Sequence, residues 1–131
     1  IHAFDVESDV MKMTFNGMKL IMPQKSGAHV ALKNIDLNGI KALSLFVLAP
    51  EAQVNAVGGK VELRLGSPQG ELVGESGIVK TTPALNQNPE VLNIPLKLKD
   101  TSKSQDLYVV FVHPKIKDKT LMVMVRAEFQ L

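Results

Sequence analysis

The sequence predicts an all-β domain, built as a sandwich or barrel of antiparallel strands. Short apolar runs of strand length recur along all 131 residues, with turn-forming residues between them. Nowhere do apolar residues keep the helical period for three turns, so we expect little helix. In residues 60–65, apolar Val61, Leu63 and Leu65 alternate with charged residues, the pattern of a strand buried on one face.

Turn-forming residues set the boundaries of the strands that we expect. Glycine takes a positive φ, proline has a fixed φ, and Asn and Asp bond to nearby backbone, so each marks a reversal of the chain. These separators are Asn16-Gly17, residues 25–27, Asn38-Gly39, Gly58-Gly59, Pro83, Asn88-Pro89 and Asp118-Lys119. The runs between them predict strands at residues 11–15, 19–22, 28–33, 40–48, 60–65, 71–77, 90–98, 106–112 and 121–129.

We expect strands 60–65 and 71–77 to form a β-hairpin. Ser67-Pro68-Gln69-Gly70 lies between them and places a fixed φ ahead of a residue that can take a positive φ, which favours a tight turn. Residues 107–112 and 121–125, by contrast, are apolar on both faces. We expect these to be central strands, with one face in the core and the other covered by a loop, a partner or another domain.

Composition predicts one domain and excludes several classes of site. We expect residues 1–131 to form a single domain, large enough for a core without metal or disulfides, and excised from a longer chain because it begins with Ile1. The absence of cysteine excludes a disulfide, a thiolate metal site and a cysteine nucleophile. The net charge of +2, without a basic block, argues against a nucleic-acid partner. No apolar segment is long enough to span a membrane.

We also expect no enzyme activity. The sequence has no nucleophile elbow, P-loop or paired-histidine metal motif, and its only histidines are His2, His29 and His113. His29 and Asp36 suggest an acid–base pair, but their spacing along one strand and its exit would point them to opposite faces.

Several sequence blocks resemble, in the same order, those of family 6 carbohydrate-binding modules. Residues 58–74 begin Gly-Gly-Lys-Val-Glu-Leu-Arg-Leu and are similar to the family's central hairpin. Residues 27–37, 92–96, 106–111 and 128–131 resemble further strands of that family. The resemblance implies a jelly-roll β-sandwich of two antiparallel sheets, of the galactose-binding-like type, that binds a polysaccharide or oligosaccharide.

The resemblance also implies a sugar cleft formed by two aromatic side chains and an asparagine. The first aromatic position falls on His29, which either supports a sugar or is an ordinary half-buried strand residue. The second falls in residues 83–89, which hold no aromatic; Asn86 and Asn88 could bond sugar hydroxyls or could simply form turns. The asparagine position falls near Val125.

Two charged segments each have a structural and a binding interpretation. The family's calcium motif falls on residues 1–5, where both of its glutamates are replaced; Asp5, Glu7 and Asp9 either supply calcium ligands or form a solvated acidic edge. We therefore expect no cofactor, with calcium the one ion that the resemblance leaves open. Residues 115–119, Lys-Ile-Lys-Asp-Lys, are either a solvated loop or a patch for an anionic ligand.

These observations give two hypotheses for the function. The first is a non-catalytic carbohydrate-binding module on a secreted, periplasmic or cell-surface chain, which tethers an attached sugar-active enzyme, such as a glycoside hydrolase, to a glycan. The second is a structural or protein-interaction sandwich that has lost the sugar cleft and packs on a neighbouring domain of the same chain. Titration with glycans, with His29→Ala alongside, separates the two.

Overall fold

The structure is a computed structural model that describes residues 4–15, 17–83 and 88–131. Ten strands and one helical turn form in these residues, which confirms the expectation of little helix. No helix in this described part is long and apolar enough to cross a membrane. The elements are β1 (Val6–Ser8), β2 (Val10–Phe15), β3 (Met18–Pro23), β4 (His29–Ile35), β5 (Ala42–Leu48), α1 (Glu51–Val54), β6 (Lys60–Leu65), β7 (Glu71–Glu75), β8 (Glu90–Pro95), β9 (Gln105–Val112) and β10 (Val123–Gln130).

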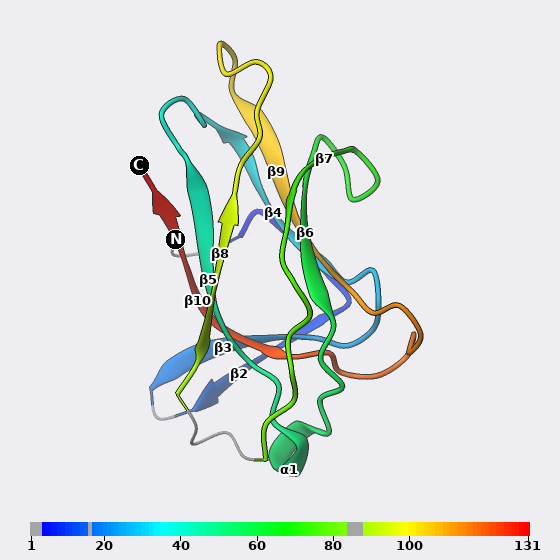
Figure 1. Cartoon of the computed structure of the whole chain (residues 1–131). Helices are drawn as coiled ribbons and strands as arrows, with labels where there is room; N and C mark the ends of the chain where they lie inside the picture. Colours follow the sequence, from blue (N-terminus) through cyan, green and yellow to red (C-terminus); the bar gives the residue numbers. More distant parts are fainter. Residues whose placement is uncertain (1–3, 16, 84–87) are drawn as a thin grey trace.

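The strands form two five-stranded sheets that pack into a sandwich (Figure 1). Sheet A has the order β1-β4-β9-β6-β7, and sheet B the order β2-β3-β10-β5-β8, with antiparallel pairing throughout. From β4 to β10 the chain crosses between the sheets after almost every strand, so that neighbours in a sheet are mostly distant in sequence. The predicted jelly-roll sandwich of two antiparallel sheets is confirmed.

Alternate residues of the central strands point inward and meet in one main core cluster. In β9, Leu107, Val109 and Phe111 are at most 1% exposed. Leu45 of β5 and Leu63 of β6 reach the same cluster from the two sheets and are fully buried. Because the inner faces of both sheets contribute, burial of this apolar surface holds the two layers together.

The predicted hairpin of β6 and β7 is confirmed, with β6 at the predicted residues. The Gly70 amide donates to the carbonyl oxygen of Ser67 at 3.0 Å and closes the turn. A Cβ at Gly70 would collide with the carbonyl oxygen of Leu65, so this turn requires glycine. The pairing of β6 with β7 shifts its register between Leu63 and Arg64. Arg64 is the last outward-facing residue of β6 before the turn.

The two doubly apolar runs belong to central strands, as predicted, since β9 and β10 each occupy the middle of a sheet. The outer face of β9 was expected to be covered by a loop, a partner or another domain, but its own sheet covers it. Tyr108 and Val110 are only 7% and 4% exposed there, and they cluster with Ala31 of β4, Val6 of β1 and Val112. Side chains of sheet A itself supply this cover, so β9 does not need a loop or a second domain to bury it.

Several strand boundaries differ from the prediction because backbone hydrogen bonds redirect the chain. The sequence misses β1, which is only three residues long and has no apolar run. The run predicted from residue 40 becomes a strand only at residue 42, since the Ile40 amide donates to Leu37 in a turn. The strand predicted to residue 98 ends at residue 95, because the Lys97 amide donates to Val73 in the other sheet. In addition, β7 ends at residue 75 where residue 77 was predicted, and β10 begins at residue 123 where residue 121 was predicted.

Candidate functional site

His29 begins β4 and lies on the outer face of sheet A. Its neighbour Val30 is fully buried in the core, and alternation along the strand points His29 the opposite way. The half-buried imidazole lies beside Tyr108, with ring centroids 5.7 Å apart and planes tilted by 52°. Its Nδ1 lies 3.0 Å from the Gly27 carbonyl oxygen. Because that oxygen can only accept, Nδ1 donates, and Nε2 of the neutral ring keeps a lone pair for a ligand.

Glu62 and Arg64 of β6 share this outer face and hold each other in place. Arg64 Nε donates to Glu62 Oε1 at 3.0 Å, and Arg64 Nη1 donates to the Gly70 carbonyl oxygen at 2.8 Å. The Arg64 and Glu62 side chains are 24% and 16% exposed. Lys60 Nζ approaches the other carboxylate oxygen of Glu62 at 3.8 Å. These bonds use only part of the guanidinium's donors, so further N–H groups remain for a ligand.

A hollow of about 290 Å³, which we call the outer groove, lies over this face. Val112 of β9 and Pro68 of the β6–β7 turn give it an apolar surface, while Glu62 and Arg64 give it fixed polar groups. His29 lies beside the groove because it pairs with Val110 in the ladder of β4 and β9. Apolar surface beside fixed polar groups is what recognition of a sugar ring requires. The groove is lined by Gly27, Glu62, Arg64, Pro68, Gln69, Val110 and Val112.

The other residues predicted for a sugar cleft lie elsewhere. Asn86 lies outside the described residues. Asn88 is exposed and precedes β8, an edge strand of sheet B, whereas His29 belongs to sheet A. Val125, at the expected asparagine position, is half-buried and packs against a small cluster that includes Met22 and Val123. The structure therefore places His29 beside the outer groove but does not bring Asn88 into its lining.

His29 and Asp36 lie at opposite ends of β4. His29 is the first residue of the strand and Asp36 follows its last residue. At about 3.3 Å per residue, they are about 20 Å apart. The expectation that they do not form an acid–base pair is confirmed.

The acidic residues near the amino end each have a separate partner. Asp5 Oδ2 accepts from a backbone amide of β4 at 2.8 Å. Glu7 lies 3.1 Å from Lys12 Nζ, and Asp9 lies 3.9 Å from Lys25 Nζ. Within residues 4–15, 17–83 and 88–131, no three His, Asp or Glu side chains converge as a metal site would require. In the described residues, Asp5, Glu7 and Asp9 thus bond separately, in and beside β1, which is an edge strand.

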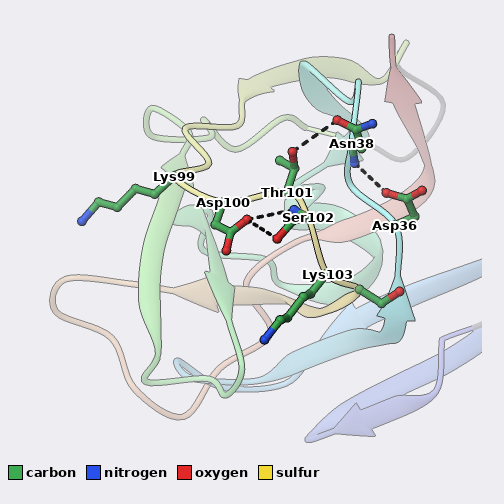
Figure 2. Close-up of a pocket in the computed structure, with 8 residues that line it drawn as sticks. Asp36, Asn38, Lys99, Asp100, Thr101, Ser102 and Lys103 are labelled. Atoms are coloured by element: carbon green, nitrogen blue, oxygen red, sulfur yellow. Dashed lines mark hydrogen bonds between the residues drawn. The ribbon is translucent and has the colours of Figure 1, made fainter.

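A second hollow, of about 520 Å³, lies between the β4–β5 and β8–β9 connections, at the top of Figure 1. Figure 2 shows Thr101 reaching across to Asn38, with 3.2 Å between Thr101 Oγ1 and Asn38 Oδ1. Hydrogen bonds from the Ser102 hydroxyl and amide lower the pKa of Asp100 below its ordinary value of 3.8. This loop pocket is lined entirely by polar or charged residues and offers no apolar face to a sugar. They are Asp36, Asn38, Lys99, Asp100, Thr101, Ser102, Lys103 and Ser104.

Sequence reasoning did not single out Glu62 and Arg64, which line the outer groove, or Tyr108, which lies beside His29. The alternation of β6 shows that Glu62 and Arg64 face away from the core. That signal does not show that β9 lies beside β6, with Tyr108 opposite Arg64 and Val110 opposite Glu62. Only the order of strands in sheet A joins these residues into a groove.

Solved structures of carbohydrate-binding modules share this architecture. A β-1,3-glucan-binding family 6 module from Bacillus halodurans has a TM-score of 0.77 and 21% identity, over 98% of this chain and 91% of its own. A family 6 module from Clostridium cellulolyticum in complex with xylose has a TM-score of 0.74 and 20% identity, over 98% and 92%.

A longer chain contains the same fold. A glycoside hydrolase family 43 arabinoxylan arabinofuranohydrolase from Bacillus subtilis, in complex with cellotetraose, matches 98% of this chain with 26% of its own. Its TM-score is 0.74 and its identity 18%. No protein-family model and no curated protein matches the sequence. The chain has the β-sandwich fold of family 6 carbohydrate-binding modules, as its sequence blocks predict.

Proposed function

We propose that this chain is a non-catalytic module that binds a polysaccharide or oligosaccharide in the outer groove. The observation that carries this proposal is the apolar surface of Val112 and Pro68 beside the fixed Arg64–Glu62 pair. A pyranose ring presents CH groups on its face and hydroxyls around its rim, so it needs both kinds of surface. Because Arg64 is held by two hydrogen bonds before a ligand arrives, little side-chain entropy is lost on binding.

Three polar groups have distinct roles in this proposal. Arg64 donates to sugar oxygens, Glu62 accepts from hydroxyls, and His29 accepts through Nε2 at the rim of the groove. Asn86 and Asn88 stay predictions for a contact made from sheet B. The names of the similar solved structures mention β-1,3-glucan, xylose and cellotetraose, which supports a glycan as the ligand class.

The module would serve a larger exported protein by tethering. Holding a catalytic domain near its substrate raises the effective concentration of that substrate without new contacts at the catalytic centre. The match to about a quarter of a glycoside hydrolase chain supports an attached sugar-active enzyme. A polysaccharide ligand in turn supports a secreted, periplasmic or cell-surface location.

Titration calorimetry and retention on insoluble glycans test the proposal. We expect Arg64→Met to weaken binding about tenfold or more, and His29→Ala about fivefold, since each removes a polar contact to the sugar. Arg126→Met is the matched control, because Arg126 lies on the outer face of sheet B over the Phe46 ring, at 4.1 Å from its centroid. Equal loss in both arginine variants, or no retention on any glycan, would overturn the assignment.

A protein-interaction sandwich is the second candidate, and exposed apolar side chains favour it. Leu72 on edge strand β7 is 41% exposed, and Val91 on edge strand β8 is 52% exposed. A hollow of about 380 Å³ lies where these two strands meet, lined in part by Leu72 and Pro95. Two results together would favour this candidate. The chain would co-purify with a neighbouring domain, and the double variant Leu72→Ser/Val91→Ser would not. The native chain would also bind none of the glycans tested.

A further inference from the structure

We infer that the glycan bound in the outer groove is acidic, a polysaccharide that carries carboxylate or sulfate groups. This inference rests on the proposed function and names its ligand class. It starts from two exposed loops at one end of the groove. The connection from β9 to β10 carries Lys115, Lys117 and Lys119, and the connection from β3 to β4 carries Lys25. We call these four side chains the lysine rim.

The lysine rim continues the groove. Val112 and Gly27 both line the groove, and the two lysine-bearing loops lie directly beside them in sequence. The loops are tied together: the Ser26 amide donates to the Lys117 carbonyl oxygen at 2.8 Å, and the His113 amide donates to Ser26 Oγ at 3.0 Å. Figure 1 shows them side by side at the right-hand edge of the sandwich, below the β6–β7 turn. A chain lying over Val112 would therefore leave the groove across the rim.

The carboxylates beside the groove are already paired. Glu62 lies 3.0 Å from Arg64 and 3.8 Å from Lys60, and Glu75 lies 3.3 Å from Lys60. These pairs neutralise the acidic groups of β6 and β7 on this face. The two carboxylates are thus balanced by Arg64 and Lys60, so this part of the groove carries no net charge.

The rim itself has an excess of positive charge. Asp9 lies 3.9 Å from Lys25, and Asp118 is the one acidic residue of residues 113–120. In the described part of the chain, the ion pairs within 4.0 Å do not include Lys115, Lys117 or Lys119. The three lysines are exposed and lie within five residues of one loop, and the field of an exposed charge decays over about 10 Å at 0.1 M salt. The rim therefore attracts anions more strongly than the chain's net charge of +2 suggests.

Arg64 fits the same ligand at the other end of the groove. A planar guanidinium matches a carboxylate or a sulfate with paired N–H donors, and Arg64 keeps donors beyond its bonds to Glu62 and Gly70. Because Glu62 already balances the charge of Arg64, a repeating acidic sugar would bond to Arg64 through its oxygens and place its anionic groups mainly at the rim. The loop pocket lacks this arrangement, because Lys99 and Lys103 share it with Asp36 and Asp100.

Two charge-matched triple variants test the inference. One is Lys115→Gln/Lys117→Gln/Lys119→Gln in the rim. The control, Lys97→Gln/Lys99→Gln/Lys103→Gln, removes three positive charges near the loop pocket. The probes are polygalacturonate, dextran sulfate and a neutral β-1,3-glucan, each titrated at low and high salt.

We expect the rim variant to bind the acidic probes about tenfold more weakly than the native chain, and the control less than about twofold. High salt should weaken acidic binding in the native chain, because exposed charges are screened. Tighter binding of neutral glucan than of both acidic probes would overturn the inference and leave the proposed function intact. An equal loss of affinity in the two variants would also overturn it, because a general attraction between positive and negative charges would then explain the binding. Retention of none of the probes or other glycans would overturn the proposed function itself. The stronger of the two acidic probes identifies the anionic group.

Discussion

Replacing Arg64 with methionine tests how the outer groove is held in shape. Methionine keeps an unbranched apolar stem but lacks the N–H donors of the guanidinium. The change removes the 3.0 Å hydrogen bond to Glu62 and the 2.8 Å hydrogen bond to the Gly70 carbonyl oxygen. Because the Glu62 side chain is only 16% exposed, water can replace the lost donor only in part.

The expected cost follows from these two bonds. A hydrogen bond to a charged group contributes about 1.5–3 kcal/mol, and Lys60 at 3.8 Å still compensates Glu62 in the variant. We expect Arg64→Met to lower the free energy of unfolding by about 2 kcal/mol and Glu62→Gln by about 1 kcal/mol. The double variant should lose about 2 kcal/mol, which leaves a coupling energy of about 1 kcal/mol between the two side chains.

Urea unfolding of the four chains measures this cycle. With a slope of about 1–3 kcal/mol per molar urea, the midpoint of Arg64→Met should fall by about 1 M. The control Arg126→Met should lose less than about 1 kcal/mol, since its side chain is 62% exposed and its partner Glu128 lies 3.3 Å away. If the costs of Arg64→Met and Glu62→Gln simply add, to within about 0.3 kcal/mol, the reasoning about a fixed pair is wrong.

Three further predictions concern the stability of the sandwich and the titration of one carboxyl. Phe111→Ala should lower the free energy of unfolding by about 3–5 kcal/mol in a urea titration, because the ring is fully buried, while Leu131→Ala, at a site 83% exposed, should not. Gly59→Ala should cost about 2 kcal/mol in the same assay, because φ is +126° and the added Cβ meets a β9 carbonyl oxygen. A lowered pKa means that Asp100 stabilises the fold above pH 3.8 and loses this effect as the pH falls through its folded pKa. Its carboxyl should titrate below 3.8 by NMR, and Ser102→Ala should move the midpoint upward.

The parts of the fold that the sequence predicts are those set by local patterns. The strand β6 matches its prediction because strict alternation and the turn at Ser67–Gly70 act within a few residues. The outer groove was not predictable in this way. It exists because β9 lies between β4 and β6, which brings His29, Val110 and Glu62 onto one face. Such pairing depends on the packing of the whole sandwich, and no local pattern specifies it.

Each strand beside the groove has an inward face that packs in the core and an outward face that is turned to the groove. On β6, Leu63 is fully buried in the core, whereas Arg64, the next residue, points to the groove. Inward residues are constrained by close packing, so a sequence that keeps them keeps the fold. Outward residues such as Arg64 and His29 can change at much smaller cost to the core, and in the proposed function they contact the ligand. The block that resembles the family 6 hairpin includes the outward residues Glu62 and Arg64 as well as the inward ones, so the loops of the lysine rim are where a difference in ligand must be tested.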